Sequence, residues 1–411
     1  MENNIKISII GDLMCDNALL NAAKVDENNF QFDNVFENAK QIWDDSNLVI
    51  ANFETVLGGK PPWRAIGSIF NTPDDFAKAI KNAGIDVLLT ANNHAYDGGI
   101  AGVRRTKKVL EDLGFDVVGT LDNRQPLVKD VEGISLAILA YTEDVNFVTD
   151  EDDKDSVISG SINLLAPLPN KRQLKLQEKE MYKGFKGKIK YILRQMINSK
   201  ALKPVKKAYS DYRIKNKKVT LGSRTDTLKS RHTDSDMLKK LEEELMLAKQ
   251  SSDLVIVNGH CGGQLNKSPG EYVRYITEFY KKRGADCFIG NHPHVIQEAS
   301  FDESFLSTAS IGSVTQTPDG EYRDNPLKPY YSMMVNVYYD KQSKSISKTT
   351  FSFIRAIADE KRYVYLYDVE KLYNERTDMR DEIEEDVKQL YMTVTGKKLE
   401  GQDIIRREYQ L

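Results

Sequence analysis

The chain has 411 residues, 40% of them hydrophobic, and a formal net charge of −3, which suffices for one large core or two modest domains and points to no particular class of partner. Its three cysteines, Cys15, Cys261 and Cys287, contain no C-x-x-C pair and exclude a disulfide framework, as expected for a reducing compartment. No apolar run approaches the roughly 18 residues of a membrane span, and no signal peptide precedes the first strand, so we expect a cytoplasmic protein.

Short apolar strands alternate with amphipathic helical segments along the first 300 residues. Strands are predicted at 5–10, 48–51, 86–90, 115–118, 134–141, 254–257 and 287–289. Helices are predicted between them at 33–46, 73–84, 99–113, 235–250 and 269–283. Strands that alternate with helices of this length are typical of βαβ units, so the sequence predicts an α/β fold.

The chain beyond residue 330 has a different pattern. Antiparallel strands joined by polar turns are predicted at 333–339, 349–357 and 362–367, followed by a charged helix at 376–396. We therefore predict a single domain over residues 1–370 and a C-terminal helix and tail over residues 371–411.

Residues 165–233 are predicted to be an insertion between two strands of the sheet. Between Lys171 and Lys218 there are 17 lysines and arginines but only three acids, and apolar residues recur at helical spacing, which predicts one or two basic amphipathic helices. Such a segment is either a solvated excursion or a cap that attracts an anionic polymer or a phosphorylated substrate, and contact with an anionic membrane is a further alternative. No nucleic-acid recognition motif accompanies the basic residues, so we expect no nucleic-acid partner.

Side chains that bind metals follow the predicted strands one after another. They are Asp12, Glu54, Asn93, His94, His260, His292 and His294. Four of the chain's five histidines are in this set, and the fifth, His232, lies in the insertion. Ligands of open α/β sheets bind at the carboxyl ends of the strands, so this placement indicates one shared site. In His292-Pro293-His294 the proline fixes its own φ and stiffens the pair of rings.

A set that mixes imidazoles, carboxylates and an amide oxygen suits two divalent ions of borderline softness. Mn²⁺, Fe²⁺ and Zn²⁺ fit such a set better than Ca²⁺ or Mg²⁺, which prefer oxygen ligands alone. Two ions about 3.5–4 Å apart polarise a phosphoryl or acyl oxygen and activate water as a nucleophile.

Several motifs occur in the order that a known family has them. They are Gly11-Asp12-Leu13-Met14, Asn52-Phe53-Glu54, the stretch from Ala91 through Asn92-Asn93-His94 to Asp97-Gly98-Gly99, His260-Cys261-Gly262-Gly263-Gln264, Gly290-Asn291-His292-Pro293-His294 and Ser310-Ile311-Gly312. With them the chain resembles the CapA family, the poly-gamma-glutamate capsule biosynthesis proteins, within the calcineurin-like metallophosphoesterase superfamily. The resemblance covers roughly residues 5–320 outside the insertion, and it implies an αββα sandwich with the site at the strand ends.

The resemblance also implies which residues bind which ion. One ion would be held by Asp12, Glu54 and His294. The other would be held by Glu54 as a bridging ligand together with Asn93, His260 and His292.

Two further residues receive catalytic roles from the resemblance. His94 would protonate the leaving group or stabilise the transition-state anion, and Asp97 would orient the His94 ring through a hydrogen bond. The alternative for Asp97 is an acid at a helix N-terminus, where the macrodipole favours negative charge.

The chain departs from the pattern at a few positions. Met14 stands where the superfamily usually has a second ligand histidine, and Cys261 and Gln264 replace a tryptophan and an acid. An arginine often found near Asn17 and an asparagine often found near Ser313 are also missing. These changes leave the metal set nearly intact and put the choice of substrate in doubt.

Three functions therefore remain open. The first is a dinuclear metal hydrolase that acts on a phosphoester or a related anionic bond. The second is a capsule or exopolymer biosynthesis factor that handles a polyanion and cleaves or transfers an amide-linked chain. The third is a metal-binding or polymer-binding accessory protein without turnover. The expected partners are an anionic small molecule or polymer and membrane-associated biosynthesis proteins.

Overall fold

The structure of the chain is a computed structural model. It describes residues 4–66, 69–146, 154–169, 226–302, 304–318, 325–361, 363–401 and 403–411. The basic helices predicted between Lys171 and Lys218 lie outside these ranges.

The first sheet has eight strands in the order β15-β14-β13-β1-β2-β5-β6, with β16 paired to β14. These strands are β1 (Asn4–Leu13), β2 (Leu48–Phe53), β5 (Val87–Leu89), β6 (Asp116–Val118), β13 (Tyr331–Asp340), β14 (Ser345–Ala358), β15 (Val364–Asp368) and β16 (Tyr409–Gln410). Strands β1, β2, β5 and β6 are parallel, and β13 to β16 join them through antiparallel pairs.

The second sheet has six strands in the order β11-β12-β10-β9-β8-β7. They are β7 (Leu127–Val131), β8 (Ile134–Thr142), β9 (Leu254–His260), β10 (Cys287–Asn291), β11 (Ala299–Asp302) and β12 (Phe305–Thr308). Its four central strands are parallel, and β7 and β11 run antiparallel at its edges. A separate hairpin consists of β3 (Arg64–Ile66) and β4 (Ile69–Asn71).

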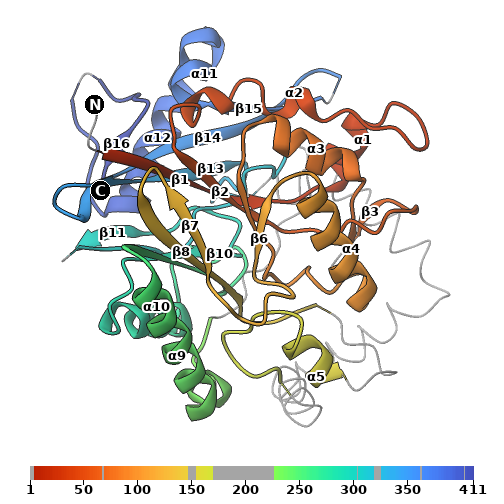
Figure 1. Cartoon of the computed structure of the whole chain (residues 1–411). Coiled ribbons are helices and arrows are strands. Elements are labelled where there is room, and N and C mark those ends of the chain that lie inside the picture. Colours follow the sequence, from red (N-terminus) through yellow and green to blue (C-terminus); the bar gives the residue numbers. More distant parts are fainter. Residues whose placement is uncertain are drawn as a thin grey trace, which may run out of the picture.

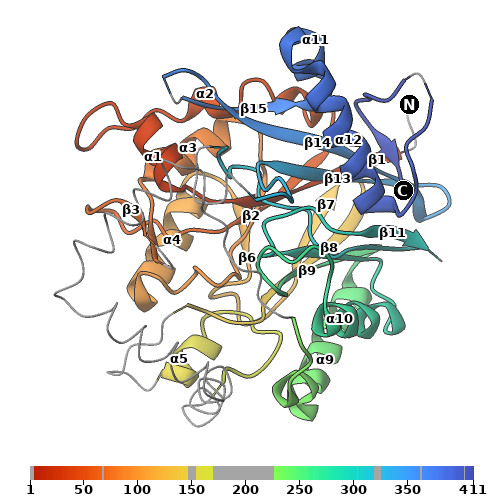
Figure 2. The same cartoon turned by 180° about the vertical axis from the view of Figure 1, so that it is seen from behind.

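Helices cover the outer faces of both sheets (Figures 1 and 2). The first sheet is covered by α1 (Asn17–Ala23), α2 (Asp33–Phe36), the 3₁₀ turn η1 (Lys40–Ile42) and α3 (Asp74–Asn82), with α4 (Gly99–Asp112) beside them. The second sheet is covered by α9 (Ser235–Ser251) and α10 (Glu271–Lys282). The remaining helical elements are α5 (Lys154–Ser159), η3 (Ser230–Thr233), α11 (Val369–Glu375), η4 (Thr377–Met379) and α12 (Arg380–Thr395). The fold is thus the four-layer αββα sandwich that the resemblance implies.

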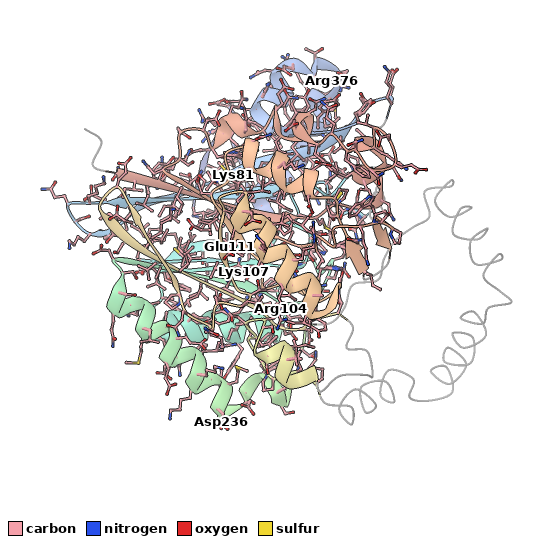
Figure 3. All side chains as sticks on the ribbon, turned by 45° about the vertical axis from the view of Figure 1, so that its right-hand side comes forward. Lys81, Arg104, Lys107, Glu111, Asp236 and Arg376 are labelled. Atoms are coloured by element: carbon pink, nitrogen blue, oxygen red, sulfur yellow. The ribbon has the colours of Figure 1, made fainter. Side chains whose placement is uncertain are left out.

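The apolar pattern of the strands and that of the helices decide which side chains lie between these layers. Alternate residues of each strand face opposite sides of a sheet, so Ile5, Ile7 and Ile9 of β1 enter the apolar core between the sheets. On the second sheet Val255 and Val257 face the other way, onto the helices. Exposed charges such as Arg104 and Glu111 on α4 and Asp236 on α9 lie on the outer sides of the helices (Figure 3). Within the described ranges no helix is both long and apolar enough to cross a bilayer.

The helix predicted at 33–46 is wrong, because the chain forms only the short α2 and η1 there. The buried residues Val35, Phe36, Ala39, Ile42 and Trp43 have the spacing of an amphipathic α-helix, which explains the prediction. The backbone N–H groups of Ala39 and Ile42 instead bond the carbonyls three residues back, at Phe36 and Ala39, which is the 3₁₀ pattern.

A bulge in β1 turns Asp12 into the space between the sheets. Strict alternation after Ile9 would place Asp12 on the helix side. The pairing with β2 shifts by one residue between Ile10 and Asp12, which leaves Gly11 as the extra residue. A side chain on Gly11 would meet the Gly312 carbonyl oxygen at 2.0 Å, so only glycine fits at this bulge.

We predict that Gly290→Ala lowers the free energy of unfolding by about 2–3 kcal/mol, because the added Cβ would lie 2.1 Å from the Ala309 carbonyl oxygen and the backbone must shift. Gly84→Ala is the control: its φ is +87° but no atom lies within 4 Å of the added Cβ, so the loss there should be about 1 kcal/mol. Urea unfolding of both variants checks the difference. Equal losses would contradict the packing explanation.

Candidate metal centre

The predicted site residues come together where the carboxyl ends of strands from both sheets meet. Asp12 lies in β1, and Glu54 directly follows β2. Asn93 and His94 lie in the turn after β5. His260 ends β9, and His292 and His294 follow β10. Because the two sheets face each other, strands distant in sequence deliver these side chains to one place.

Asp12, Glu54 and His294 form the first candidate metal group. His294 Nδ1 lies 3.1 Å from Asp12 Oδ2, and its Nε2 lies 3.6 Å from Glu54 Oε1. All three side chains are buried. The structure therefore assembles the three residues that the resemblance assigns to one ion.

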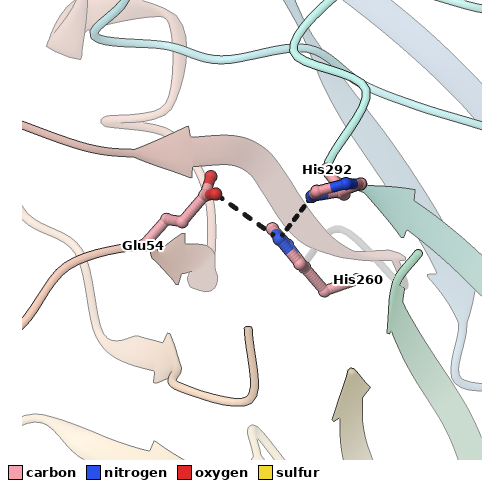
Figure 4. A group of neighbouring side chains, drawn as sticks. All are labelled: Glu54, His260 and His292. Carbon is pink, nitrogen blue, oxygen red and sulfur yellow. Dashed lines mark hydrogen bonds and ion pairs between the residues drawn. The ribbon is translucent and has the colours of Figure 1, made fainter. Parts of the chain in front are cut away.

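Glu54, His260 and His292 form the second candidate group (Figure 4). His260 Nε2 lies 3.5 Å from Glu54 Oε1 and 3.1 Å from His292 Nδ1. The same Nε2 lies 2.7 Å from Asn93 Oδ1, so the amide oxygen belongs to this cluster too. Asn93 and His292 are only half-buried, so solvent reaches this cluster on their side.

Glu54 is shared by the two groups, and its carboxylate fits a metal ligand. Both of its oxygens are buried without a hydrogen-bond partner among the described residues. A buried carboxylate that accepts no hydrogen bond is costly, and a bound cation removes that cost. The surrounding donors are imidazole nitrogens, a carboxylate and an amide oxygen, the mixed set that suits Mn²⁺, Fe²⁺ or Zn²⁺.

The pKa values of these side chains reflect their burial and their charged neighbours. Burial raises the pKa of Glu54 to about 8, and the neighbouring Asp12 adds to this effect. Burial alone would lower the pKa of His294, but the facing Glu54 and Asp12 carboxylates raise it to about 9. Burial lowers the pKa of His260 to about 3 and that of His292 well below its usual value. The nearby His294 lowers both pKa values further. The neutral imidazoles of His260 and His292 are in the protonation state that metal binding requires, whereas Glu54 and His294 would release protons when an ion binds.

The backbone of His292-Pro293-His294 is unusual. His292 has a φ of 98° and His294 a φ of 57°, which non-glycine residues rarely adopt. Such strain persists only where the surroundings enforce it, and it is concentrated at functional sites. Here it aims one ring at each group.

His94 lies beside the two groups and is held by Asp97. Its Nδ1 lies 2.6 Å from Asp97 Oδ2, and its Nε2 lies 4.0 Å from Glu54 Oε1. A proton on Nδ1 therefore donates to Asp97, and Nε2 faces the metal groups. The sequence did not predict Phe70, whose ring stacks on His94 at 4.1 Å and whose backbone N–H donates to the same Asp97 oxygen. No pattern in the sequence marks it, because the β3–β4 hairpin brings it there.

The chain matches a family of known proteins. Residues 6–305 match the family model described as bacterial capsule synthesis protein PGA_cap. The chain belongs to this family.

Curated relatives share the same region. The chain is 23% identical over 306 residues to the capsule biosynthesis protein CapA of Bacillus anthracis, which covers 72% of this chain and 56% of that protein. It is 22% identical over 335 residues to the PGA biosynthesis protein CapA of Bacillus subtilis (strain 168), which covers 80% of this chain and 67% of that one. The matched region thus spans little more than half of the first relative.

A solved structure with a similar arrangement is that of a novel phosphatase from Mycoplasma pneumoniae. It has a TM-score of 0.44 and 12% sequence identity, and the match covers 92% of this chain and 100% of that chain.

Two departures from the family pattern have simple structural accounts. Met14 is buried, and its backbone N–H donates to Thr315 Oγ1 at 2.8 Å, so a packed thioether replaces a ligand ring. Cys15 and Cys261 are buried, and burial raises the pKa of both thiols well above the usual value. Neutral buried thiols fit a packing role.

We predict that Glu54→Gln weakens Mn²⁺ binding at both groups. The loss of affinity should exceed the roughly 10–100-fold that follows removal of a residue that only orients a ligand. In metal-free buffer the variant should unfold at the wild-type temperature or above, because it replaces a buried carboxyl group that accepts no hydrogen bond from the described residues. Calorimetric titration and thermal unfolding measure the two effects.

The matched control is Glu244→Gln, a buried carboxylate on α9 that accepts hydrogen bonds from Arg124 and Tyr141 and belongs to neither candidate ligand group. It should lose stability and keep both ions. Wild-type Mn²⁺ affinity in Glu54→Gln would contradict the shared-ligand role.

Proposed function

We propose that this chain is a dinuclear metal-dependent hydrolase that acts on an anionic substrate, either a phosphoester or a bond in a capsule or exopolymer compound. The observation that most supports this proposal concerns the carboxylate of Glu54. Its two buried oxygens accept no hydrogen bond from the described residues, and it is common to two groups of ligand side chains.

In this proposal Asp12, Glu54 and His294 hold one ion, and Glu54, Asn93, His260 and His292 hold the other. Mn²⁺, Fe²⁺ and Zn²⁺ match these donors. Such ions supply Lewis-acid activation of water and of the substrate oxygen. The protein contributes the fixed positions of the ligands and a buried, low-dielectric surrounding in which electrostatic stabilisation is strong.

His94 is the proposed general acid. Asp97 accepts a hydrogen bond from Nδ1–H of His94, which leaves Nε2 as the atom that gives a proton to the leaving group. The Phe70 ring covers one face of the imidazole and limits access of water from that side. Asn146 Nδ2 lies 3.4 Å from His94 Nε2, so an amide donor is also close to where the leaving group would be.

The proposed substrate class rests partly on charge. The 17 lysines and arginines between Lys171 and Lys218 lie outside the described residues, but the segments that flank them do not. Pro167 on one flank accepts a hydrogen bond from Arg231 on the other, and Arg231 also bonds Glu143, whose backbone N–H donates to the His260 carbonyl oxygen. Both flanks thus lie close to His260, where a basic segment would attract an anionic polymer. Cytoplasmic location and membrane-associated biosynthesis partners belong to the same proposal.

The family supports a second function. Two curated relatives carry names of capsule or PGA biosynthesis. A role in which the chain cleaves or transfers an amide-linked polymer, or binds it as an accessory without phosphoesterase turnover, is therefore the alternative.

A substrate panel separates these functions. The purified chain with Mn²⁺ is incubated with p-nitrophenyl phosphate, bis-p-nitrophenyl phosphate, nucleotides and γ-glutamyl peptides. Phosphoester turnover that chelation abolishes supports the hydrolase, and cleavage of the γ-glutamyl peptides alone supports the amide alternative. Two bound ions without turnover of any substrate would contradict the enzyme and support the accessory role.

On a substrate that this panel identifies, His94→Ala should lower kcat by about 10²–10⁴-fold, because the leaving group loses its proton donor. Elemental analysis should still find two ions, since His94 is in neither ligand group. Asp97→Asn should cause a smaller loss of kcat, because it only loosens the ring. An unchanged kcat in His94→Ala would exclude it as the acid.

A further inference from the structure

Asn52 belongs to the motif Asn52-Phe53-Glu54 but to neither candidate metal group. It occupies β2 at the inward-facing position after Leu48 and Ile50, whose side chains lie in the core between the sheets. It is fully buried, and its Oδ1 has no hydrogen-bond partner among the described residues. An amide at such a position is costly compared with an apolar side chain, which indicates that it is needed there for another reason.

The contacts of Asn52 supply that reason. Its Nδ2 donates to Asp12 Oδ1 at 2.7 Å, because the bulge at Gly11 places Asp12 beside it in the register of β1 and β2. The same Nδ2 lies 3.1 Å from Nδ1 of His260, which belongs to the other sheet. Asn52 therefore touches one ligand from each candidate metal group.

Both contacts are on the sides of the ligands that face away from Glu54. Asp12 presents Oδ2 to His294 and Oδ1 to Asn52. His260 presents Nε2 to Glu54 and Nδ1 to Asn52. For Nε2 to bind an ion, the ring proton must be on Nδ1, and Nδ2 of Asn52 cannot then donate to that nitrogen. The bond to His260 therefore belongs to the ion-free centre, whereas the bond to Asp12 persists when ions bind.

We infer that Asn52 is a positioning residue that holds Asp12 and His260 together and so couples the two ion-binding groups. The inference rests on the metal centre of the proposed function and adds a link between its two halves. Residues that orient metal ligands in this way change metal affinity by about 10–100-fold when they are lost. Because the bond to Asp12 persists when ions bind and the bond to His260 does not, the loss of Asn52 should weaken the binding step at the Asp12 group more than the other step.

The test is calorimetric titration of the full chain with Mn²⁺, in wild type and in Asn52→Leu, which keeps the side-chain volume similar and removes both polar contacts. We expect the Kd of one step to rise by about 10-fold or more, and the Kd of the other to change less, while two ions still bind. The matched control is Asn258→Leu. Asn258 is also a fully buried asparagine, on β9 two residues before His260, but its amide donates to the Ile289 carbonyl and to no ligand. That variant should keep wild-type Kd values.

The outcomes distinguish this inference from the proposed function. Wild-type Kd values in Asn52→Leu overturn the positioning role alone. Equal weakening in Asn258→Leu also overturns it, because the effect would then come from the core and not from the ligands. A wild-type chain that binds no Mn²⁺ overturns the metal centre itself.

If Asn52→Leu does not fold, the smaller Asn52→Ser takes its place in the same titration. Asn52→Asp tests the role further, because a purely structural change would not alter the ratio of the two Kd values. Its carboxylate accepts from His260 Nδ1–H but repels Asp12, so it should weaken one binding step more than the other. Equal weakening of the two steps in Asn52→Asp would overturn the link through Asp12.

Discussion

The burial of two carboxylates, Asp12 and Glu54, between two apolar sheets is the constraint on which the site depends. A charge in such surroundings is stable only when it is paired. Asp12 is paired with His294 and Asn52, whereas Glu54 has imidazoles around it but no hydrogen bond from the described residues. A divalent cation completes this arrangement, and the side chains that surround Glu54 are those that a borderline metal prefers.

The fold satisfies this constraint through its backbone. Parallel strands in both sheets bring their carboxyl ends to one place, so short loops are enough to present the ligands. Glycines precede Asp12, His260 and the His-Pro-His segment, and side chains at Gly11 and Gly290 would collide with backbone carbonyl oxygens. The bulge at Gly11 and the positive φ values of His292 and His294 then aim individual side chains. Local strain at the centre is held by the rigid sheets around it.

Membership of the capsule synthesis family and the geometry of the centre describe different aspects of the chain. The family accounts for the order of the motifs over residues 6–305. The geometry places His94, held by Asp97, at the edge of the two candidate metal groups. Met14 is buried, and the first group consists of Asp12, Glu54 and His294.

The sequence by itself determined the alternation of strands and helices, because apolar periodicity is a local property, and the residue type after each strand was enough to name the candidate ligands. It could not determine which way Asp12 faces, since the bulge depends on the close approach of Gly312. The helix predicted at 33–46 failed although the buried residues have helical spacing, because the backbone there forms short turns with bonds three residues back. Phe70, Asn52 and Asn146 gain their places only when the hairpin, the facing sheet and the strand ends pack together. Tertiary structure decided these contacts because each joins residues whose distance along the chain carries no information about their distance in space.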